Sequence, residues 1–228
     1  EKMIFSLNYD GNSIFFKAPA LGEVNAMNMS AAYITALMLE QDNITFFKGL
    51  ESYQGFPGRF ERFTIPQKKL EIIIDYAHTP DSLESLLSLV KEIYPERDLL
   101  TLFGCGGDKS KLKRSIMGDV ATRYSKFVVL TNDNPRNENP SAIINDITKG
   151  VTDQDKYHVI LDRSEAIKTC LSKSQDCILV FAGKGAEDFM IIGGQEIYHN
   201  DKICLIEWCY QNNLTLINTS SREKIDEN

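Results

Sequence analysis

From Asp98 to Asn213 the chain alternates short apolar runs with amphipathic helical patterns, and this alternation limits the folds open to it. The apolar runs are rich in β-branched and aromatic residues, and each is followed by a stretch with apolar residues at helical spacing. The expected strands begin at 98, 126, 157 and 177, and the expected helices span 112–124, 140–151, 163–174 and 202–213, with a short hairpin at 190–200. This order predicts an α/β fold, a Rossmann-like doubly wound domain with a mostly parallel sheet.

Polar or glycine-rich loops follow the first, second and fourth of these strands. Their sequences are GCGGDKSK at 104–111, TNDNPRNENP at 131–140 and AGKGAED at 182–188. In an open parallel sheet, ligands bind outside the carboxyl ends of the strands, so the loops are expected to meet at one edge. Arg136, at the tip of the second loop, is therefore expected to face a ligand.

The part of the chain before Asp98 has a different organisation. A hairpin is expected at 5–19, a helix at 22–41, a strand at 69–80 and a helix at 80–93, in which Pro80 occupies a position that tolerates proline. A polar loop lies between the first helix and the strand. We place a domain boundary in it near residue 58, which gives domains 1–58 and 59–228.

Composition excludes several classes of partner. The net charge of −7 provides no basic surface for nucleic acid, and no run of apolar residues is long enough to span a membrane. The five cysteines form no CxxC pair, which favours reduced thiols in a cytoplasmic protein. The histidines, cysteines and acids show no metal-ligand spacing, so no metal site is expected from these residues.

Eight short motifs together resemble the Mur ligase family of peptidoglycan synthesis. In chain order they are GEVNAMN, FPGRFE, DYAHTPDSL, GCGGD, KRSIMG, TNDNPRNENP, DRSEAI and AGKGAED. The resemblance covers nearly the whole chain and is closest to the branch that adds meso-2,6-diaminopimelate to UDP-MurNAc-L-Ala-D-Glu. It implies the C-terminal part of a central ATP-binding domain, followed by the amino-acid-binding C-terminal domain of a cytoplasmic, monomeric ligase. Such a ligase activates a carboxylate with ATP and Mg²⁺ through an acyl phosphate.

The resemblance also implies an amino-acid site. The turn Asp133, Asn134, Pro135 and Arg136 would bind the far carboxylate of diaminopimelate, because a guanidinium offers two parallel hydrogen bonds that lysine cannot. Gly183 and Glu187 would bind the ammonium at the same end of the amino acid. Two positions depart from the family pattern: Lys109 replaces an arginine, and Ala186 stands where histidine is common.

For the nucleotide, the resemblance implies Asn25 and Asn28 near the adenine, with Arg59, Asp75 and His78 near the phosphates and ribose. The family's phosphate loop, a GTxGKT-like sequence, does not occur in the chain, so ATP and Mg²⁺ would be held largely by another part of a longer ligase. None of these residues is assigned a catalytic role, and the chain alone is expected to be inactive.

Three alternatives compete with this interpretation. The same scaffold could add L-lysine, although lysine-adding relatives usually lack an arginine at the place of Arg136. A non-catalytic ligand-binding module would also account for the absence of the phosphate loop. A dinucleotide-dependent dehydrogenase is disfavoured, because GCGGD lacks the GxGxxG spacing.

Overall fold

The computed structural model describes residues 2–18, 20–220 and 223–225. Contacts divide the chain into two compact units, Glu1–Gly55 and Phe56–Asn228, which we call unit 1 and unit 2. Each unit has its own core and is described by itself. Within the described residues, the helices are all too short or too polar to cross a membrane.

Unit 1 consists of one hairpin and two helices. Strands β1 (Met3–Tyr9) and β2 (Asn12–Ala18) pair antiparallel, as the sequence predicts, although Pro19 at the end of the expected hairpin lies outside the described residues. Asp10 and Gly11 both have positive φ, which matches the twist that a two-residue hairpin loop requires. Helices α1 (Glu23–Met38) and α2 (Asn43–Glu51) enclose a small aromatic core around Phe16 with the hairpin.

Unit 2 is built on an eight-stranded sheet in the order β12-β11-β3-β4-β8-β5-β6-β7. The five strands from β4 to β7 in this order are parallel, and three antiparallel strands extend the sheet beyond β4. The parallel strands are β4 (Leu70–Asp75), β8 (Ile178–Ala182), β5 (Leu99–Phe103), β6 (Phe127–Leu130) and β7 (Tyr157–Val159). The others are β3 (Glu61–Ile65), β11 (Leu216–Asn218) and β12 (Glu223–Ile225). The predicted doubly wound α/β fold is therefore confirmed.

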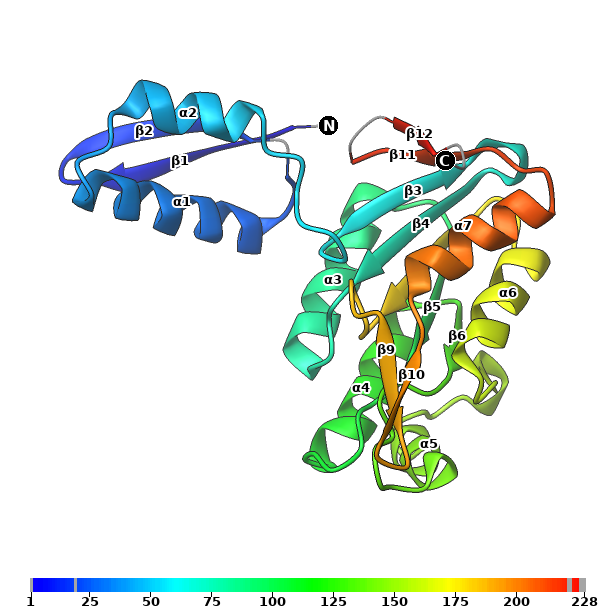
Figure 1. The fold of residues 1–228 in the computed structure, drawn as a ribbon. Coiled ribbons are helices and arrows are strands. Elements are labelled where there is room, and N and C mark those ends of the chain that lie inside the picture. The colour runs from blue at the N-terminus through cyan, green and yellow to red at the C-terminus, as the bar shows by residue number, and fades with distance from the viewer. Residues whose placement is uncertain (1, 19, 221–222, 226–228) are drawn as a thin grey trace. The chain divides into compact units, whose positions relative to one another are not determined.

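Helices cover both faces of this sheet (Figure 1). One face packs against α3 (Pro80–Ile93), α4 (Leu112–Tyr124) and α5 (Pro140–Thr148), and the other against α6 (Arg163–Lys173) and α7 (Asp201–Gln211). The strands alternate accordingly, because Ile73 faces the first group of helices while Ile72 and Ile74 face the second. A separate hairpin, β9 (Phe189–Ile192) and β10 (Gln195–Tyr198), follows β8. Two short 3₁₀ helices, Pro66–Lys68 and Gln154–Lys156, complete the unit.

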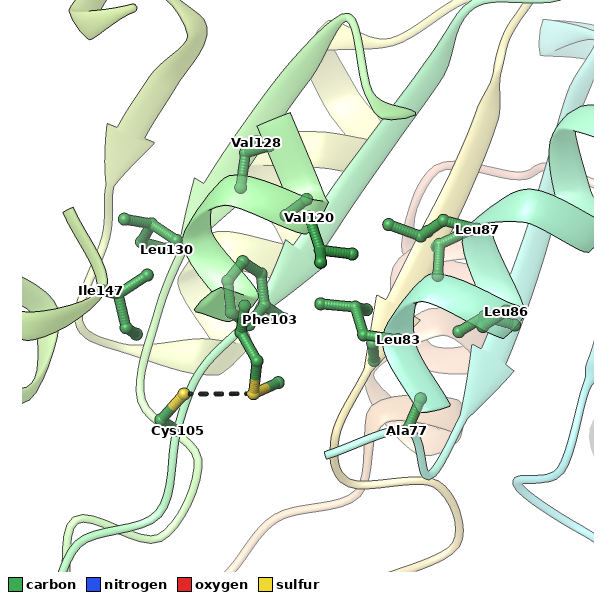
Figure 2. Close-up of a cluster of buried hydrophobic side chains, with 14 of the residues drawn as sticks. Ala77, Leu83, Leu86, Leu87, Phe103, Cys105, Val120, Val128, Leu130 and Ile147 are labelled. Atoms are coloured by element: carbon green, nitrogen blue, oxygen red, sulfur yellow. Dashed lines mark hydrogen bonds between the residues drawn. The ribbon is translucent and has the colours of Figure 1, made fainter. Parts of the chain in front are cut away.

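Figure 2 shows the core between the sheet and α3, α4 and α5. Its aliphatic side chains are almost completely buried, and Cys105 lies at its edge with Sγ 3.7 Å from the sulfur of Met117. Burial raises the pKa of the Cys105 thiol to about 12, so this cysteine is protonated and packed rather than reactive. The core fixes β5 and β6, whose carboxyl ends carry two of the three loops identified from the sequence.

Local signals determine where the helices begin. Thr79 and Ser82 form a capping box at the start of α3, with Pro80 in the first turn. The side chains of Asn139, Asp162 and Asn200 accept backbone N–H bonds at the starts of α5, α6 and α7. These helices start close to the positions predicted from the sequence, and each leads the chain away from the edge where the loops lie.

Candidate functional site

The loops that follow β5, β6 and β8 lie at one edge of the sheet, and they are in direct contact. A Cβ on Gly107 would lie 1.9 Å from the carbonyl oxygen of Pro135, and a Cβ on Gly183 would lie 2.7 Å from Oδ2 of Asp133. A larger residue at position 107 would have to displace the backbone of the neighbouring loop, and one at position 183 would have to displace the Asp133 side chain. The glycines therefore allow the loop 131–140 to pack between the other two.

The turn from Asp133 to Arg136 is bound to the β9 strand. The Ile191 N–H donates to Oδ1 of Asn134 (2.9 Å), and the Arg136 N–H donates to the carbonyl of Ile191 (2.8 Å). The Gly193 N–H in turn donates to the carbonyl of Arg136 (2.7 Å). Pro135 is buried, and Arg136 has a φ of 51°, a left-handed conformation uncommon for residues other than glycine. The hairpin thus holds a strained turn in one conformation.

The Arg136 guanidinium lies across the first loop and is half-buried. Its Nη1 donates to the carbonyl oxygens of Gly107 (2.8 Å) and Asn134 (3.4 Å). A Cβ on Gly106 would come within 2.9 Å of Nη1, so this glycine leaves space for the cation. Lys109, in the same loop, is exposed.

An ion pair between Arg114 and Glu138 supports this first loop, residues 104–111. The Arg114 guanidinium is fully buried and donates to both carboxylate oxygens of Glu138 (2.8 and 2.9 Å) and to the Gly106 carbonyl (3.2 Å). The Asp108 N–H donates to Glu138 as well (2.6 Å). Hydrogen bonding from Arg114 lowers the pKa of Glu138 to about 2, so the carboxylate keeps its charge over the ordinary pH range.

Glu187 lies in the third loop, and three side chains from different segments bind its carboxylate. Oε2 accepts from Nζ of Lys184 (2.6 Å) and from Nδ2 of Asn134 (3.1 Å), while Oε1 accepts from the hydroxyl of Tyr76 (3.2 Å). Partial burial alone would raise the pKa of Glu187, but the Lys184 ammonium and the other donors lower it overall. The group is therefore a fixed anion, with 26% of its side chain exposed.

Lys184 and Tyr76 both bind Glu187, and neither is among the site residues predicted from the sequence; the environment of Lys184 explains why it is missed. It is completely buried, and its ammonium donates to Glu187, to Oδ1 of Asn134 (3.1 Å) and to the Phe189 carbonyl (2.5 Å). A lysine between two glycines, as in GKG, suggests a phosphate-binding loop. The Lys184 ammonium instead points inward, where it has three protein acceptors. The signal available in the sequence is its place directly after a buried strand, where a solvated lysine is not expected.

Arg136 and Glu187 are joined through one residue. The backbone carbonyl of Asn134 accepts from the Arg136 guanidinium, and its side-chain amide donates to Glu187. Asp133 lies buried beside them, and its burial raises its pKa against the opposing charges of Arg163 and Lys184. One cation and one anion that are partly accessible to solvent therefore lie on either side of Asn134, an arrangement that suits a zwitterionic ligand.

The residues predicted near a nucleotide are divided between the units. In unit 2 the Arg59 guanidinium lies 4.4 Å from the centre of the Tyr76 ring, and Nδ1 of the exposed His78 lies 2.9 Å from the Tyr76 carbonyl oxygen. Both oxygens of Asp75 accept backbone N–H bonds, one from Phe60 (2.7 Å) and one from Ala77 (2.8 Å). Burial raises the pKa of Asp75 despite these bonds. Asp75 therefore holds the turn that presents Arg59.

In unit 1, Asn25 and Asn28 lie three residues apart in α1, so they share one helix face. Asn28 is exposed, while Nδ2 of Asn25 donates to the Leu21 carbonyl (2.7 Å).

A buried network of charged residues, Arg163, Asp201 and His199, connects two of the site loops to helices α6 and α7. The Arg163 guanidinium is fully buried and binds both carboxylate oxygens of Asp201 (2.8 and 2.7 Å). It also donates to the carbonyls of Asn132 (3.3 Å) and Ala182 (3.0 Å), which belong to two different site loops. Nε2 of His199 lies 2.7 Å from Oδ1 of Asp201. The network therefore joins the starts of α6 and α7 to the ends of β6 and β8.

Protonated His199 should stabilise unit 2 at low pH. Burial by itself lowers the pKa of His199, but the hydrogen bond and charge of Asp201 raise it above its ordinary value of 6.5. A group whose pKa rises on folding contributes stability below its unfolded pKa, and that contribution is lost as the pH rises through the folded pKa. The free energy of unfolding of the wild type, minus that of His199→Gln, should therefore decrease as the pH rises above 6.5.

Urea denaturation across this pH range measures the difference. His158→Gln is the matched control, because His158 is exposed on β7. A difference between wild type and His199→Gln that stayed constant with pH would contradict the expectation.

Comparison with known proteins identifies similar chains. A family model described as "Mur ligase, glutamate ligase domain" matches residues 58–185. The UDP-N-acetylmuramoyl-L-alanyl-D-glutamate–2,6-diaminopimelate ligase of Cytophaga hutchinsonii is 39% identical over 204 residues, which cover 88% of this chain and 41% of the relative. A ligase of the same name, numbered 2, from Clostridium acetobutylicum is 42% identical over 201 residues, covering 87% of this chain and 41% of the relative.

Solved structures show the same fold. A 2,6-diaminopimelate ligase superimposes with a TM-score of 0.65 at 33% identity, covering 92% of this chain and 43% of the other. UDP-N-acetylmuramate–alanine ligase from Thermotoga maritima has a TM-score of 0.63 at 19% identity, covering 88% of this chain and 40% of the other. The chain thus spans about two fifths of the length of the relatives that it matches.

Proposed function

The chain belongs to the Mur ligase family, and we propose that it is part of an ATP-dependent ligase that adds meso-2,6-diaminopimelate to UDP-MurNAc-L-Ala-D-Glu. Two relatives of 39% and 42% identity carry the name of this activity. Because the chain corresponds to only part of their length, the activity is that of a longer protein. This part would supply the amino-acid site and some of the groups that contact the nucleotide.

The observation that carries the proposal is the pair of charges on either side of Asn134. In meso-diaminopimelate the end that does not react has a carboxylate and an ammonium on one carbon. Arg136 would bind the carboxylate through its guanidinium, and Glu187 would bind the ammonium. Pro135 and the bonds from β9 hold the turn before a ligand arrives, which reduces the entropy lost on binding. L-Lysine lacks the far carboxylate and would leave the Arg136 charge without a partner.

ATP would supply the phosphoryl group that activates the carboxylate of the acceptor substrate. Arg59 would bind a phosphate of the nucleotide, because its guanidinium is exposed and its N–H groups donate hydrogen bonds to phosphate oxygens. Asp75 would act by holding the Arg59 turn, and His78 could donate a further hydrogen bond. Asn25 and Asn28 would contact the base, and Mg²⁺ would be held largely by residues outside this chain.

Gly183 would bind the same ammonium as Glu187 through its backbone, and it lets the third loop approach Asp133. Lys184 would have a positioning role, because it keeps Glu187 charged and oriented. Lys109 would contribute a charge without the two-pronged geometry of arginine. We further propose that the ligase is a cytoplasmic monomer without nucleic-acid or membrane partners; the net charge of −7 on this chain supports the absence of a nucleic-acid partner.

The test is amino-acid-dependent release of phosphate by the full-length ligase that contains this chain. With ATP and UDP-MurNAc-L-Ala-D-Glu present, meso-diaminopimelate should support release and L-lysine should support little. Activity with lysine and none with diaminopimelate would reject the proposed substrate. If neither amino acid supported phosphate release, another amino acid would be favoured as the substrate of the same scaffold.

A further inference from the structure

Tyr76 occupies a position in the candidate site to which no role has been assigned so far. It directly follows β4, and its hydroxyl donates to Oε1 of Glu187 over 3.2 Å. The other carboxylate oxygen, Oε2, already accepts from Lys184 and Asn134. Among the described residues Oε1 has one hydrogen-bond donor, Tyr76, so it keeps the acceptor capacity that a cationic ligand beside the Tyr76 hydroxyl would use.

Packing fixes the ring of Tyr76 independently of this hydrogen bond. The Arg59 guanidinium lies over the ring at 4.4 Å, and the His78 ring packs edge-on with its centre 4.7 Å away. From the third loop, a Cβ on Gly185 would lie 2.9 Å from Cβ of Tyr76 and 3.2 Å from Cδ2, so the loop backbone rests on this side chain. The hydroxyl is thus held at one place relative to Glu187.

We propose that Tyr76 is a further amino-acid-binding residue, whose hydroxyl oxygen accepts a hydrogen bond from the same ligand ammonium that binds Oε1 of Glu187. An ammonium carries three N–H donors and needs several acceptors, which one carboxylate oxygen does not satisfy. A phenol that donates its hydrogen to a carboxylate still has acceptor capacity on its oxygen. The inference rests on the proposed function, because it assumes an amino acid with an ammonium at this end.

The protonation of Tyr76 agrees with this role. Burial and the Glu187 charge raise the pKa of the phenol, against a smaller opposing effect of Arg59. The hydroxyl therefore remains neutral at physiological pH, donating to Glu187 while accepting from the ligand.

The experiment pairs a protein variant with a ligand variant. Tyr76→Phe removes only the hydroxyl and keeps the ring that Arg59 and Gly185 contact. The kcat/KM of the full-length ligase that contains this chain is measured for meso-diaminopimelate and for 2-aminopimelate, which lacks the second amine but keeps both carboxylates. Only the orientation with the single amine of 2-aminopimelate at the reacting end is productive, and binding in the reverse orientation does not change kcat/KM. We expect Tyr76→Phe to lower kcat/KM for diaminopimelate roughly 10-fold or more, as for a lost hydrogen bond to a charged group, and kcat/KM for 2-aminopimelate by less than about twofold.

Tyr124→Phe is the matched control, because its hydroxyl also donates to a glutamate, Oε1 of Glu84 (3.3 Å), at the far end of α4. It should change neither value of kcat/KM. Equal losses for both ligands in Tyr76→Phe would assign the residue a structural role and overturn the inference alone. No turnover of diaminopimelate by the wild-type ligase, or a kcat/KM for it that is independent of Arg136, would remove the proposed function and this inference together.

Discussion

Replacement of Arg136 by asparagine should raise the KM for meso-diaminopimelate by roughly 30- to 1,000-fold, and the KM for ATP much less. Loss of a two-pronged contact to a desolvated carboxylate costs on the order of 2–4 kcal/mol, which corresponds to this range. Steady-state kinetics of the full-length ligase measure both constants. Arg136→Lys should lie between the wild type and Arg136→Asn, because it keeps the charge and loses the planar fork.

Asparagine is preferred to alanine because of the backbone at this position. Arg136 has a φ of 51°, which asparagine tolerates better than most residues. A large effect of Arg136→Asn therefore reports the guanidinium rather than distortion of the turn.

Two comparisons complete the design. Arg123→Ala removes an arginine that is half exposed on α4 and should leave both KM values unchanged. The KM for L-lysine should not rise in Arg136→Asn, because lysine has no carboxylate at that end for the guanidinium to bind. If the KM for diaminopimelate stayed at the wild-type value in Arg136→Asn, the role assigned to Arg136 would be wrong.

The second large effect is expected at Arg163. Arg163→Met should lower the free energy of unfolding of unit 2 by about 3–5 kcal/mol, because it leaves the fully buried Asp201 without its main partner. The substitution also removes the donors that the carbonyls of Asn132 and Ala182 use. Urea denaturation followed by circular dichroism measures the change.

The double variant Arg163→Met/Asp201→Leu separates the charge from the packing. Removing both members of a buried ion pair generally costs less than removing one, so part of the stability should return. Lys126→Met is the control, because its pair with Asp98 (2.6 Å) is exposed on both sides and should contribute only about 0.2–1 kcal/mol. If Arg163→Met were no more destabilising than Lys126→Met, the ion pair between Arg163 and Asp201 would not contribute the stability that we expect of it.

The helices and parallel strands of unit 2 could be predicted because each signal is local. Pro80 after Thr79 marks the start of α3, and uninterrupted apolar runs such as Ile178–Ala182 mark buried strands. The rule that ligands bind at the carboxyl ends of parallel strands then predicts, from the sequence alone, that the three loops lie together. The fold class, and the sheet edge at which the three loops meet, therefore follow from sequence patterns that each span about ten residues.

The antiparallel side of the sheet could not be predicted in this way. The sequence predicts a polar loop at 51–63, whereas Glu61–Ile65 form β3 with Glu61 buried. Glu61 is tolerated there because its carboxylate accepts from the Gly58 N–H (2.9 Å) and from Nζ of Lys202 (2.7 Å). Lys202 is 141 residues away in sequence, so no local sequence pattern predicts its ion pair with Glu61. Helix α2 is missed as well, although Asp42 provides its N-cap.

Within the site, the residue types could be predicted but their connections could not. Arg136 and Glu187 follow from the motifs, whereas the link through Asn134 depends on the relative placement of segments 53 residues apart. The inward direction of Lys184 and the Tyr76 hydroxyl at Glu187 depend on the same placement. Such contacts are set by sheet order and loop packing, which the chain specifies only as a whole.

The bonds between the Arg136 turn and β9 have a practical consequence for exchanging substrate preference between ligases. The turn takes its backbone partners from Ile191 and Gly193, and its guanidinium donates to the Gly107 carbonyl, so the preference proposed for Arg136 would be encoded by three separate stretches of the gene. A chimera that imported residues 131–140 alone would place its arginine on a turn with mismatched neighbours. A graft of the turn together with the hairpin and the loop 104–111 would keep all the contacts that orient the guanidinium.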